Sequence, residues 1–289
     1  MTFLKGELAM YKNLLVAVDG SDQANHALHK ASQLVQPLQA QLTIGHVIDT
    51  RNVSWIAIDE GDLWLEIKQR AEQLIDQHVQ RAKSFGIDHI NTKTKSGNPR
   101  IEIPENLTVE LNIDLLILGS SGKNAVERRI IGSVTDAAVR RSPCDVLTVK
   151  KGSEQYPVYK HLLIAVDGSK QAETALTKAI RLANIFQAKL YIAHINEHDS
   201  SQQVQQNFED MIEQYRHQAE QQGVKDVITI IEQGNPRELI PNQLTTTYDI
   251  DLLITAATGR GMFERLFTGS VALSALHHAP CDVLTVKAK

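Results

Sequence analysis

The sequence predicts an α/β protein made of two tandem doubly wound domains, each a parallel sheet with helices on both faces. The first observation is a repeat, because the segment Leu14–Ser21 (LLVAVDGS) returns as Leu162–Ser169 (LLIAVDGS), 148 residues later. The segment Pro143–Lys150 (PCDVLTVK) also returns, as Pro280–Lys287, 137 residues later. Repeats of about 20–50 residues build solenoids, so this much longer period indicates a duplicated domain. The second observation is that strand and helix patterns alternate within each copy, which is typical of parallel sheets.

Short apolar runs and helical spacing predict the elements of the first copy. Ser21 or Asp22 is a suitable N-cap for the first helix, and Pro99 suits the first turn of a later one. In chain order we expect a strand at Leu14–Val18, a helix to about Val35, a strand at Leu42–Val47, an amphipathic helix from Leu63 to Ala82, a strand at Ile90–Thr94, a helix from Pro99 to about Leu111, a strand at Leu115–Leu118, a helix at Ser133–Arg141 and a strand at Asp145–Lys150.

The second copy repeats the strand pattern, so each copy has five predicted strands. Those of the second copy are Leu162–Val166, Leu190–Ile195, Val227–Ile231, Leu252–Thr255 and Asp282–Lys287. Between the copies, residues 151–160 (KGSEQYPVYK) contain the Gly, Ser and Pro of a short exposed connection. We therefore expect domains at residues 11–150 and 161–289, joined by a linker at residues 151–160.

Composition argues against several classes of protein. The 289 residues include 30 Lys and Arg against 34 Asp and Glu, a net charge of −4, which disfavours a broad surface for nucleic acid or anionic membranes. No apolar run approaches the roughly 18 residues of a membrane span, and residues 1–10 make a poor signal peptide. Cys144 and Cys281 belong to no CxxC pair and are expected as buried, inert thiols. These features predict a cytoplasmic protein.

Two loops carry residue types suited to binding a phosphate. The first strand is followed by Asp19-Gly20-Ser21, and the fourth by Gly119-Ser-Ser-Gly122 and then Gly132-Ser133 at the start of a helix. Glycines let backbone N–H groups approach an anion and adopt positive φ, and a helix N-terminus favours phosphate. In open parallel sheets, ligands bind where the strand order reverses. We therefore predict a phosphate cradle, whose counter-charges would be Lys123, Arg128 and Arg129.

Simpler interpretations of the same residues stay open. The glycines also fit the end of a strand and the start of a helix, where Ser133 and Asp136 match a capping box. The sequence contains no G-x-x-x-x-G-K-[ST], and no G-x-G-x-x-G follows the first strand. Asp19 has no second acid, histidine or nucleophile at an interpretable spacing, so we expect ligand positioning, with no catalytic residues and no protein-built metal site. His46 and His194 are expected to be hydrogen-bonded structural residues.

Several motifs together resemble the universal stress protein family in its tandem, two-domain form. They are Val16–Ser21 (VAVDGS), Gly45–Val47 (GHV), the G-x2-G-x9-G-S run from Gly119 to Ser133, and Ser142–Val149 (SPCDVLTV). The resemblance covers nearly the whole chain, from about Tyr11 to Lys287. It implies the strand order 3-2-1-4-5 in each domain, with the reversal between the first and fourth strands.

The resemblance also implies a site for ATP, with Mg²⁺, in the first domain. ATP-binding members hold adenine and ribose near the positions that match Asp19 and Val47, and the triphosphate along the glycine-rich segment. The full set of residues expected at this site is Ala17, Asp19, Val47, Gly119, Gly122, Gly132, Ser133, Val134 and Thr135.

The second copy departs from the family pattern at one motif position. The residues of its corresponding nucleotide site are Asp167, Ile195, Gly259, Gly269, Ser270 and Val271. Ala256, however, stands where the first glycine of the run belongs, and Leu273 replaces Asp136. A methyl group at Ala256 would crowd a nucleotide or forbid an unusual φ, although Arg260 and Arg265 keep the region basic. We expect an intact first site and a weakened or altered second one.

Three functions are compatible with this sequence. The first is an ATP-binding stress-response or signalling module, with an adenine nucleotide as ligand and a protein partner that the sequence does not identify. The second is a scaffold in which nucleotide binding is lost in one or both halves, and the third is a slow ATPase or autokinase. Because family members pair through their last strands, Asp145–Lys150 and Asp282–Lys287 are expected to pair within the chain as a pseudo-dimer, and two chains can form a homodimer.

Overall fold

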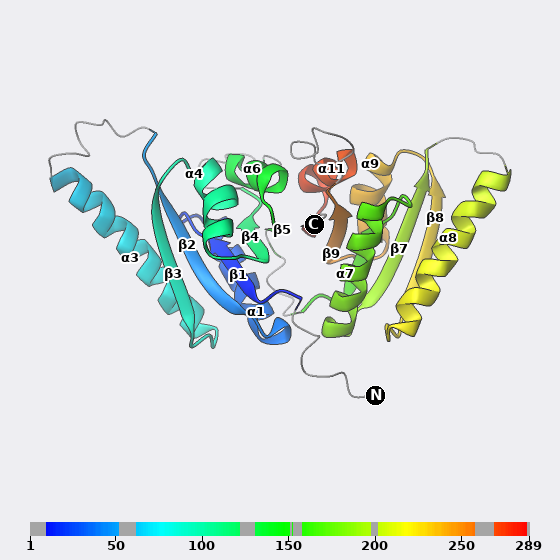
Figure 1. Ribbon diagram of the computed structural model, residues 1–289, viewed down its shortest axis with the longest axis horizontal. Helices are drawn as coiled ribbons and strands as arrows, with labels where there is room; N and C mark the ends of the chain where they lie inside the picture. The colour runs from blue at the N-terminus through cyan, green and yellow to red at the C-terminus, as the bar shows by residue number, and fades with distance from the viewer. Residues whose placement is uncertain are drawn as a thin grey trace. The chain divides into compact units, whose positions relative to one another are not determined.

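The computed structural model describes residues 10–51, 62–121, 131–150, 152, 158–197, 202–257 and 269–287. The chain divides into two compact units, Met1–Gln155 and Tyr156–Lys289. Each unit contains parallel strands that alternate with helices (Figure 1), so the predicted α/β fold class is confirmed. Of the helices in the described residues, none is long and apolar enough to cross a membrane.

The first unit follows the predicted order of elements. Its elements are β1 (Asn13–Ala17), α1 (Asp22–Leu38), β2 (Gln41–Asp49), α3 (Asp62–Ser84), β3 (Ile90–Gly97), α4 (Pro99–Ile101), the π-helix η1 (Glu102–Leu107), α5 (Thr108–Glu110), β4 (Leu115–Gly119), α6 (Ser133–Arg141) and β5 (Asp145–Val149). Its strands pair in parallel in the order β3-β2-β1-β4-β5. The order therefore reverses between β1 and β4, as the family resemblance implied.

The second unit repeats this arrangement. Its elements are β6 (His161–Ala165), α7 (Lys170–Phe186), β7 (Lys189–Asn196), α8 (Gln202–Gln221), β8 (Val227–Gln233), α9 (Pro236–Glu238), the π-helix η3 (Leu239–Leu244), α10 (Thr245–Thr247), β9 (Leu252–Ala256), α11 (Ser270–His278) and β10 (Asp282–Val286). The strands run in parallel in the order β8-β7-β6-β9-β10. In this unit the reversal falls between β6 and β9.

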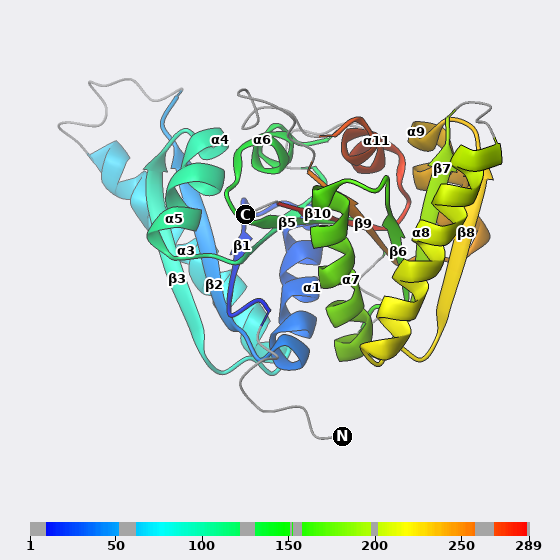
Figure 2. The same cartoon turned by 45° about the vertical axis from the view of Figure 1, so that its right-hand side comes forward.

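Opposite crossover directions place the helices on the two faces of each sheet. In the first unit α1 contacts α3, whereas α4 and η1 contact α6 (Figure 2). The core lies between these layers and the central strands, where Leu14, Leu15 and Val16 are fully buried. This layering leaves the carboxyl ends of β1 and β4, and of β6 and β9, as the places where loops can meet a ligand.

The first helix of each unit begins at a serine cap. Ser21 Oγ accepts a hydrogen bond from the Ala24 amide at 3.1 Å, and Ser169 Oγ accepts one from the Ala172 amide at 3.2 Å. Such a bond satisfies one of the N–H groups that the first helical turn leaves unpaired. The predicted cap at Ser21 is therefore confirmed, although α1 continues three residues beyond Val35, to Leu38.

The segment after the third strand departs from the regular helix that Pro99 predicted. The chain forms a π-helix at Glu102–Leu107, and the second unit does the same at Leu239–Leu244. Each π-helix contains a proline, which lacks an N–H and disfavours a regular α-helical turn. Thr108 Oγ1 donates to the Pro104 carbonyl at 2.6 Å and satisfies an acceptor within this segment.

Strands β2 and β3 are longer than predicted. They pair along eight positions, as far as Asp49 with Gly97, although the end of β3 is polar. The side chains of Lys93 and Lys95 form ion pairs with Glu110, and Lys95 also reaches Glu102 at 3.2 Å. A strand with one solvated face shows a weak apolar signal, so hydrophobic runs underestimate its length.

Two buried tyrosines tie the start of each unit to its last strand. Tyr11 Oη donates to Asp145 Oδ2 at 2.6 Å, and Tyr159 Oη donates to Asp282 Oδ2 at 2.7 Å. Burial, together with the adjacent carboxylate, raises the pKa of both phenols well above their ordinary value of 10.0. The neighbouring Cys144 is buried, as predicted, and burial raises the pKa of its thiol to about 11.

Candidate functional site

The loop after β1 holds Asp19 at the carboxyl end of the central strand. Asp19 Oδ1 accepts a hydrogen bond from the Ser21 amide at 3.0 Å, and the Val18 amide donates to the Gly45 carbonyl at 2.9 Å. Gly20, which lies between Asp19 and Ser21, has a φ of +78°, a conformation that glycine adopts at little cost. The turn therefore fixes the position of the half-buried Asp19 carboxylate beside the start of α1.

The end of β2 is joined to this loop by His46. Its Nδ1 donates to the Val18 carbonyl at 2.8 Å, because a carbonyl oxygen can only accept. The next residue, Val47, is 5% exposed. The prediction that His46 is a hydrogen-bonded structural residue is confirmed, and the bond holds the β1 loop against the strand that carries Val47.

The structure gives a different reason for a glycine at position 119 from the one that the sequence predicted. Its φ is not positive, so the expectation of an unusual backbone conformation is wrong at this position. A Cβ there would instead lie 2.7 Å from the backbone oxygen of Gln23, in the first turn of α1. Glycine is required because α1 packs directly against the end of β4. The Gly119 carbonyl also accepts a bond from Thr135 Oγ1 at 2.8 Å.

The N-terminus of α6 has no side-chain cap. Its N-cap is Gly132, with φ −61° and ψ 142°, and no side chain accepts from the first turn. The predicted capping box is wrong, because with Gly132 as the cap Asp136 lies one position too far along and pairs with Arg140 at 3.0 Å. The Gly132 amide donates to the Ser120 carbonyl at 2.9 Å. Among the described residues, the first-turn amides of Ser133 and the two residues after it have no side-chain acceptor, so they are the candidate donors to an anion.

The fold brings most of the predicted first-half residues to one edge of the sheet. Ala17 ends β1 and Asp19 lies in the loop after it, Val47 lies near the end of β2, and Gly119 ends β4. Because β1 pairs with both β2 and β4, these ends are adjacent. The α6 residues Gly132, Ser133, Val134 and Thr135 follow the same edge, since the Gly132 amide bonds to the Ser120 carbonyl. Gly122, Lys123, Arg128 and Arg129 lie outside the described residues.

The second half contains a pocket of about 490 Å³ at the corresponding place. We call it the second-half pocket, and its lining residues are Ala165, Val166, Asp167, Ala172, His194, Ile195, Asn196, Glu197, Phe208, Pro236, Ile240, Thr255, Ala256, Gly269, Ser270, Val271 and Ala272. Five of the residues predicted for a second site are thus together. The sixth, Gly259, lies outside the described residues, as do Arg260 and Arg265.

The frame of the second-half pocket repeats that of the first half. Asp167 Oδ1 accepts from the Ser169 amide at 3.0 Å, and His194 Nδ1 donates to the Val166 carbonyl at 2.9 Å. Helix α11 begins at Gly269, again without a side-chain cap. Ala256 lines the pocket without closing it, so the methyl group that replaces glycine leaves a cavity at this site.

Sequence reasoning missed the aromatic wall of this pocket. The Phe208 ring on α8 stacks on His194 with ring centroids 4.1 Å apart, and Asn196 Oδ1 lies 3.1 Å from His194 Nε2. Alignment of the two copies at the 137-residue offset places Ala71 opposite Phe208, which is a signal that a direct comparison of the repeats provides.

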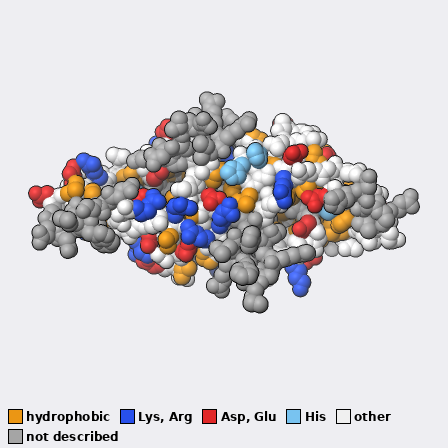
Figure 3. Space-filling view, turned by 90° about the horizontal axis from the view of Figure 1, so that it is seen from above, with side chains coloured by type: hydrophobic (Ala, Val, Ile, Leu, Met, Phe, Trp, Pro, Cys, Tyr) orange, Lys and Arg blue, Asp and Glu red, His pale blue; other side chains and the backbone are white. Residues whose placement is uncertain are grey.

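Charged side chains near the first-half site form ion pairs. Arg51 hydrogen-bonds to Asp49 at the end of β2 and holds the pKa of that carboxyl below its ordinary value. At the far end of α6, Arg141 pairs with Glu105 at 3.1 Å. Figure 3 shows Lys and Arg side chains interspersed with Asp and Glu on one face of the molecule. Acidic and basic side chains are therefore mixed on this face, which disfavours a single-sign surface there.

Comparison with known proteins gives matches in both halves. A sequence profile described as the universal stress protein family matches residues 10–150 and again residues 158–287. A protein of Staphylococcus haemolyticus, provisionally named a universal stress protein, is 40% identical over 147 residues, which are 51% of this chain and 88% of the relative. A protein of Staphylococcus aureus (strain USA300) with the same kind of provisional name is also 40% identical over 147 residues, which are 51% of this chain and 87% of the relative. The crystal structure of a universal stress protein from Archaeoglobus fulgidus has the same fold, with a TM-score of 0.75 and 20% identity over 97% of each chain.

Proposed function

The chain belongs to the universal stress protein family through both of its halves, and from this premise we propose that its first half binds ATP as the Mg²⁺ complex. In this proposal the protein is a nucleotide-responsive module of a stress response, and the bound state alters its contact with a protein partner. The observation that supports ATP binding best is the uncapped N-terminus of α6, which lies at the strand-order reversal together with the Asp19 loop.

Each part of the first-half site has a proposed task. The amides of Ser133, Val134 and Thr135 would donate to phosphate oxygens, because a helix N-terminus with unpaired N–H groups attracts anions. The Asp19 carboxylate, held in place by the Ser21 amide, would accept from a ribose hydroxyl. Val47 would offer an apolar contact to adenine. The phosphates themselves would bring the Mg²⁺ ion with them.

The proposal also concerns the setting of the protein. We propose that it acts in the cytoplasm, which its two buried and unbridged cysteines support, since reducing compartments keep thiols free. We also retain, as a proposal from the family resemblance, that the segments Asp145–Lys150 and Asp282–Lys287 pair within the chain.

The test is to remove one backbone donor while the helix is kept. Proline is tolerated at the first helical position, and Gly132 already has the extended backbone that precedes proline. Ser133→Pro therefore deletes the N–H, whereas Ser133→Ala deletes only the hydroxyl. We expect Ser133→Pro to weaken Mg·ATP binding about tenfold or more in isothermal titration, the effect of losing one charge-assisted hydrogen bond. Ser133→Ala should lose less.

A second measurement checks whether the protein holds nucleotide when it is isolated. Protein purified without added nucleotide is denatured, and the supernatant is separated by chromatography. We expect adenine nucleotide in that supernatant. The proposal fails if no nucleotide is released and titration with Mg·ATP gives no binding, or if Ser133→Pro binds as well as Ser133→Ala.

A further inference from the structure

The third strand of each unit lies at an edge of its sheet, and the two edges carry different side chains. This strand is β3 in the first unit and β8 in the second (Figure 1). In β3, Lys93 and Lys95 form ion pairs with glutamates of the segment that follows the strand. Charged side chains on an edge strand, lysine above all, keep it from pairing with a strand of another molecule.

The β8 edge is apolar where β3 is charged. At the 137-residue offset, Ile230 stands in the place of Lys93 and Ile231 in the place of Thr94. The run Val227–Ile231 (VITII) consists of β-branched residues alone, a type that packs well between paired strands. Ile231 is 38% exposed, so part of this apolar run is accessible to solvent. The second half has therefore lost the charges that protect the first.

The ladder of β7 and β8 shows which backbone groups of β8 point away from the sheet. The Leu190 amide donates to the Asp226 carbonyl at 2.9 Å. In a parallel pair, alternate residues of a strand bond to the neighbouring strand, so the even-numbered residues of β8 bond to β7. Within the described residues, no strand pairs with the other edge of β8. The residues whose N–H and C=O groups point outward are Val227, Thr229 and Ile231.

The same segment is complementary to itself in an antiparallel arrangement. A twofold axis through Thr229 places that residue opposite its own copy. The axis also sets Val227 opposite Ile231, so residues with outward-pointing backbone groups meet and exchange both N–H···O bonds. Ile228 then lies opposite Ile230. Every pair in the run therefore joins two aliphatic β-branched residues or two threonines, and such cross-strand pairs are stabilising.

The contrast between the two edges favours a closed dimer over a longer assembly. A contact between β8 and the β8 of a second copy uses the same patch on both partners, so it closes after two copies. Growth of the assembly would need a second edge that accepts a strand. At the β3 edge, Lys93 and Lys95 disfavour such a contact.

We propose that the β8 edge is an interaction surface for a second copy of this chain, and that the two β8 strands pair antiparallel about Thr229. The contact is a narrow strip, so the dimer is weak and depends on protein concentration. One pair opposes it, because Asp226 faces Glu232 of the second copy, and like charges directly opposite are destabilising. Lys189 lies 3.0 Å from Asp226 and offsets part of that repulsion. This interface does not depend on ATP binding.

Sedimentation equilibrium of the full chain, from micromolar to millimolar concentration, tests the interface. We expect an equilibrium between monomer and dimer. Ile231→Lys should weaken the dimer about tenfold or more, because each dimer contains the substitution twice. The matched control is Thr94→Lys, at the corresponding position of β3, which should leave association unchanged. Glu232→Gln removes both like-charge pairs and should strengthen the dimer about fivefold.

Hydrogen exchange at low and high protein concentration tests whether the strands pair directly. Association should protect the outward-pointing amides of Val227, Thr229 and Ile231. The amides of Ile228 and Ile230, which bond to β7, should be protected at every concentration. The proposal is overturned if the chain stays monomeric throughout the range, or if Ile231→Lys and Thr94→Lys have equal effects. A dimer that Glu232→Gln weakens, or protection that does not alternate along β8, overturns it as well.

Discussion

The two halves of this chain share a hydrogen-bonded frame and differ in residues at the carboxyl edge of their sheets. Matched bonds differ little in length, as in His46 to the Val18 carbonyl at 2.8 Å and His194 to the Val166 carbonyl at 2.9 Å. By contrast, Gly119 has become Ala256 in the second copy. After duplication, the bonds that position the loops were retained while residues at this edge changed. The frame is therefore a requirement of the fold, and the residues at this edge distinguish the two halves.

The largest expected difference between the halves concerns the last residue of β4. Gly119→Val should destabilise the first half by about 3 kcal/mol, because the added Cβ meets the Gln23 backbone at 2.7 Å and backbone cannot move aside cheaply. Ala256→Gly in the second half should cost only about 0.5–1 kcal/mol, through the greater freedom of glycine. Hydrogen exchange of the β4 and β9 amides measures each half separately. Equal losses from the two variants would contradict this account of Gly119.

The buried tyrosines should be equivalent in the two halves. Tyr11→Phe and Tyr159→Phe each remove a donor from a buried carboxylate, so each should cost about 2 kcal/mol in unfolding free energy. Urea-induced unfolding at neutral pH measures both. A clear inequality would show that the second copy no longer depends on this bond and would sharpen the comparison.

The same tyrosines predict a shared loss of stability in alkali. The pKa of each phenol is raised in the folded state, chiefly by burial, so folding favours the protonated form. This contribution is complete below the ordinary pKa of 10.0 and is lost as the pH rises above it. Unfolding temperatures measured from pH 9 upward should fall, and the Tyr→Phe variants should fall less steeply. A parallel fall in all variants would show that other groups are responsible.

Removing the serine caps should give a smaller and matched effect. Ser21→Ala and Ser169→Ala each delete an acceptor for a first-turn amide, which costs about 1 kcal/mol. The protection of the first amides of α1 and α7 in hydrogen exchange is the direct readout. If only one half responds, the two helix starts have diverged more than their geometry indicates.

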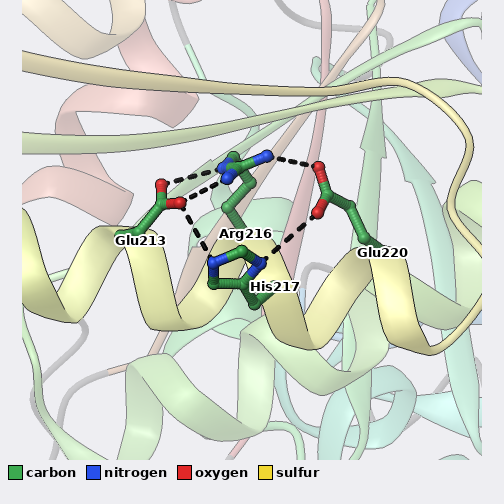
Figure 4. A network of polar contacts seen from close by, with 4 residues as sticks. All are labelled: Glu213, Arg216, His217 and Glu220. Atoms are coloured by element: carbon green, nitrogen blue, oxygen red, sulfur yellow. Dashed lines mark hydrogen bonds and ion pairs between the residues drawn. The ribbon is translucent and has the colours of Figure 1, made fainter.

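The smallest effect is expected at a surface network on α8 that the described residues of α3 do not repeat. On α8, Arg216 bonds to Glu213 and Glu220, and His217 bridges the same two carboxylates (Figure 4). In α3, Val79 takes the place of Arg216. Because solvent screens exposed pairs, Arg216→Ala should change stability little, and the change should shrink further with added salt. A large, salt-insensitive loss would contradict a surface role.

The sign of the pH effect at this network is fixed by Glu213. The Arg216 guanidinium holds the pKa of Glu213 below its ordinary value of 4.5. The contribution of this carboxylate is therefore present above pH 4.5 and is lost as the pH falls below it. Acid unfolding of the wild type and Arg216→Ala should converge at low pH.

Local chemistry made much of the fold predictable from sequence. The cap at Ser21 depends only on the helix that follows it. The buried strands β1 and β4 are indicated by their own short apolar runs. The repeat itself gave the two-part organisation. The end of β3 was underestimated because its lysines owe their place to ion pairs with Glu102 and Glu110, which come from a later segment.

The sequence predicted that several candidate residues lie together, but it did not predict the structural reason for each. Asp19, Val47 and Ser133 were expected together, and the strand order places them at one edge. The reason for Gly119 was missed because its neighbour, the Gln23 backbone, comes from another element that is brought close only by folding. The aromatic wall at Phe208 was missed for the same reason, since a half-buried phenylalanine on a helix indicates core packing until its ring partner is known.

The number of Mg·ATP molecules bound per chain tests the central claim that two similar hydrogen-bonded frames carry different candidate sites. Equilibrium dialysis of the wild type should give one ATP per chain at saturation. Binding at that site should weaken about tenfold or more in Ser133→Pro and stay unchanged in Ser270→Pro, whose preceding Gly269 has a similar backbone conformation. Two ATP molecules per chain in the wild type, or loss of the single site in Ser270→Pro, would contradict the account.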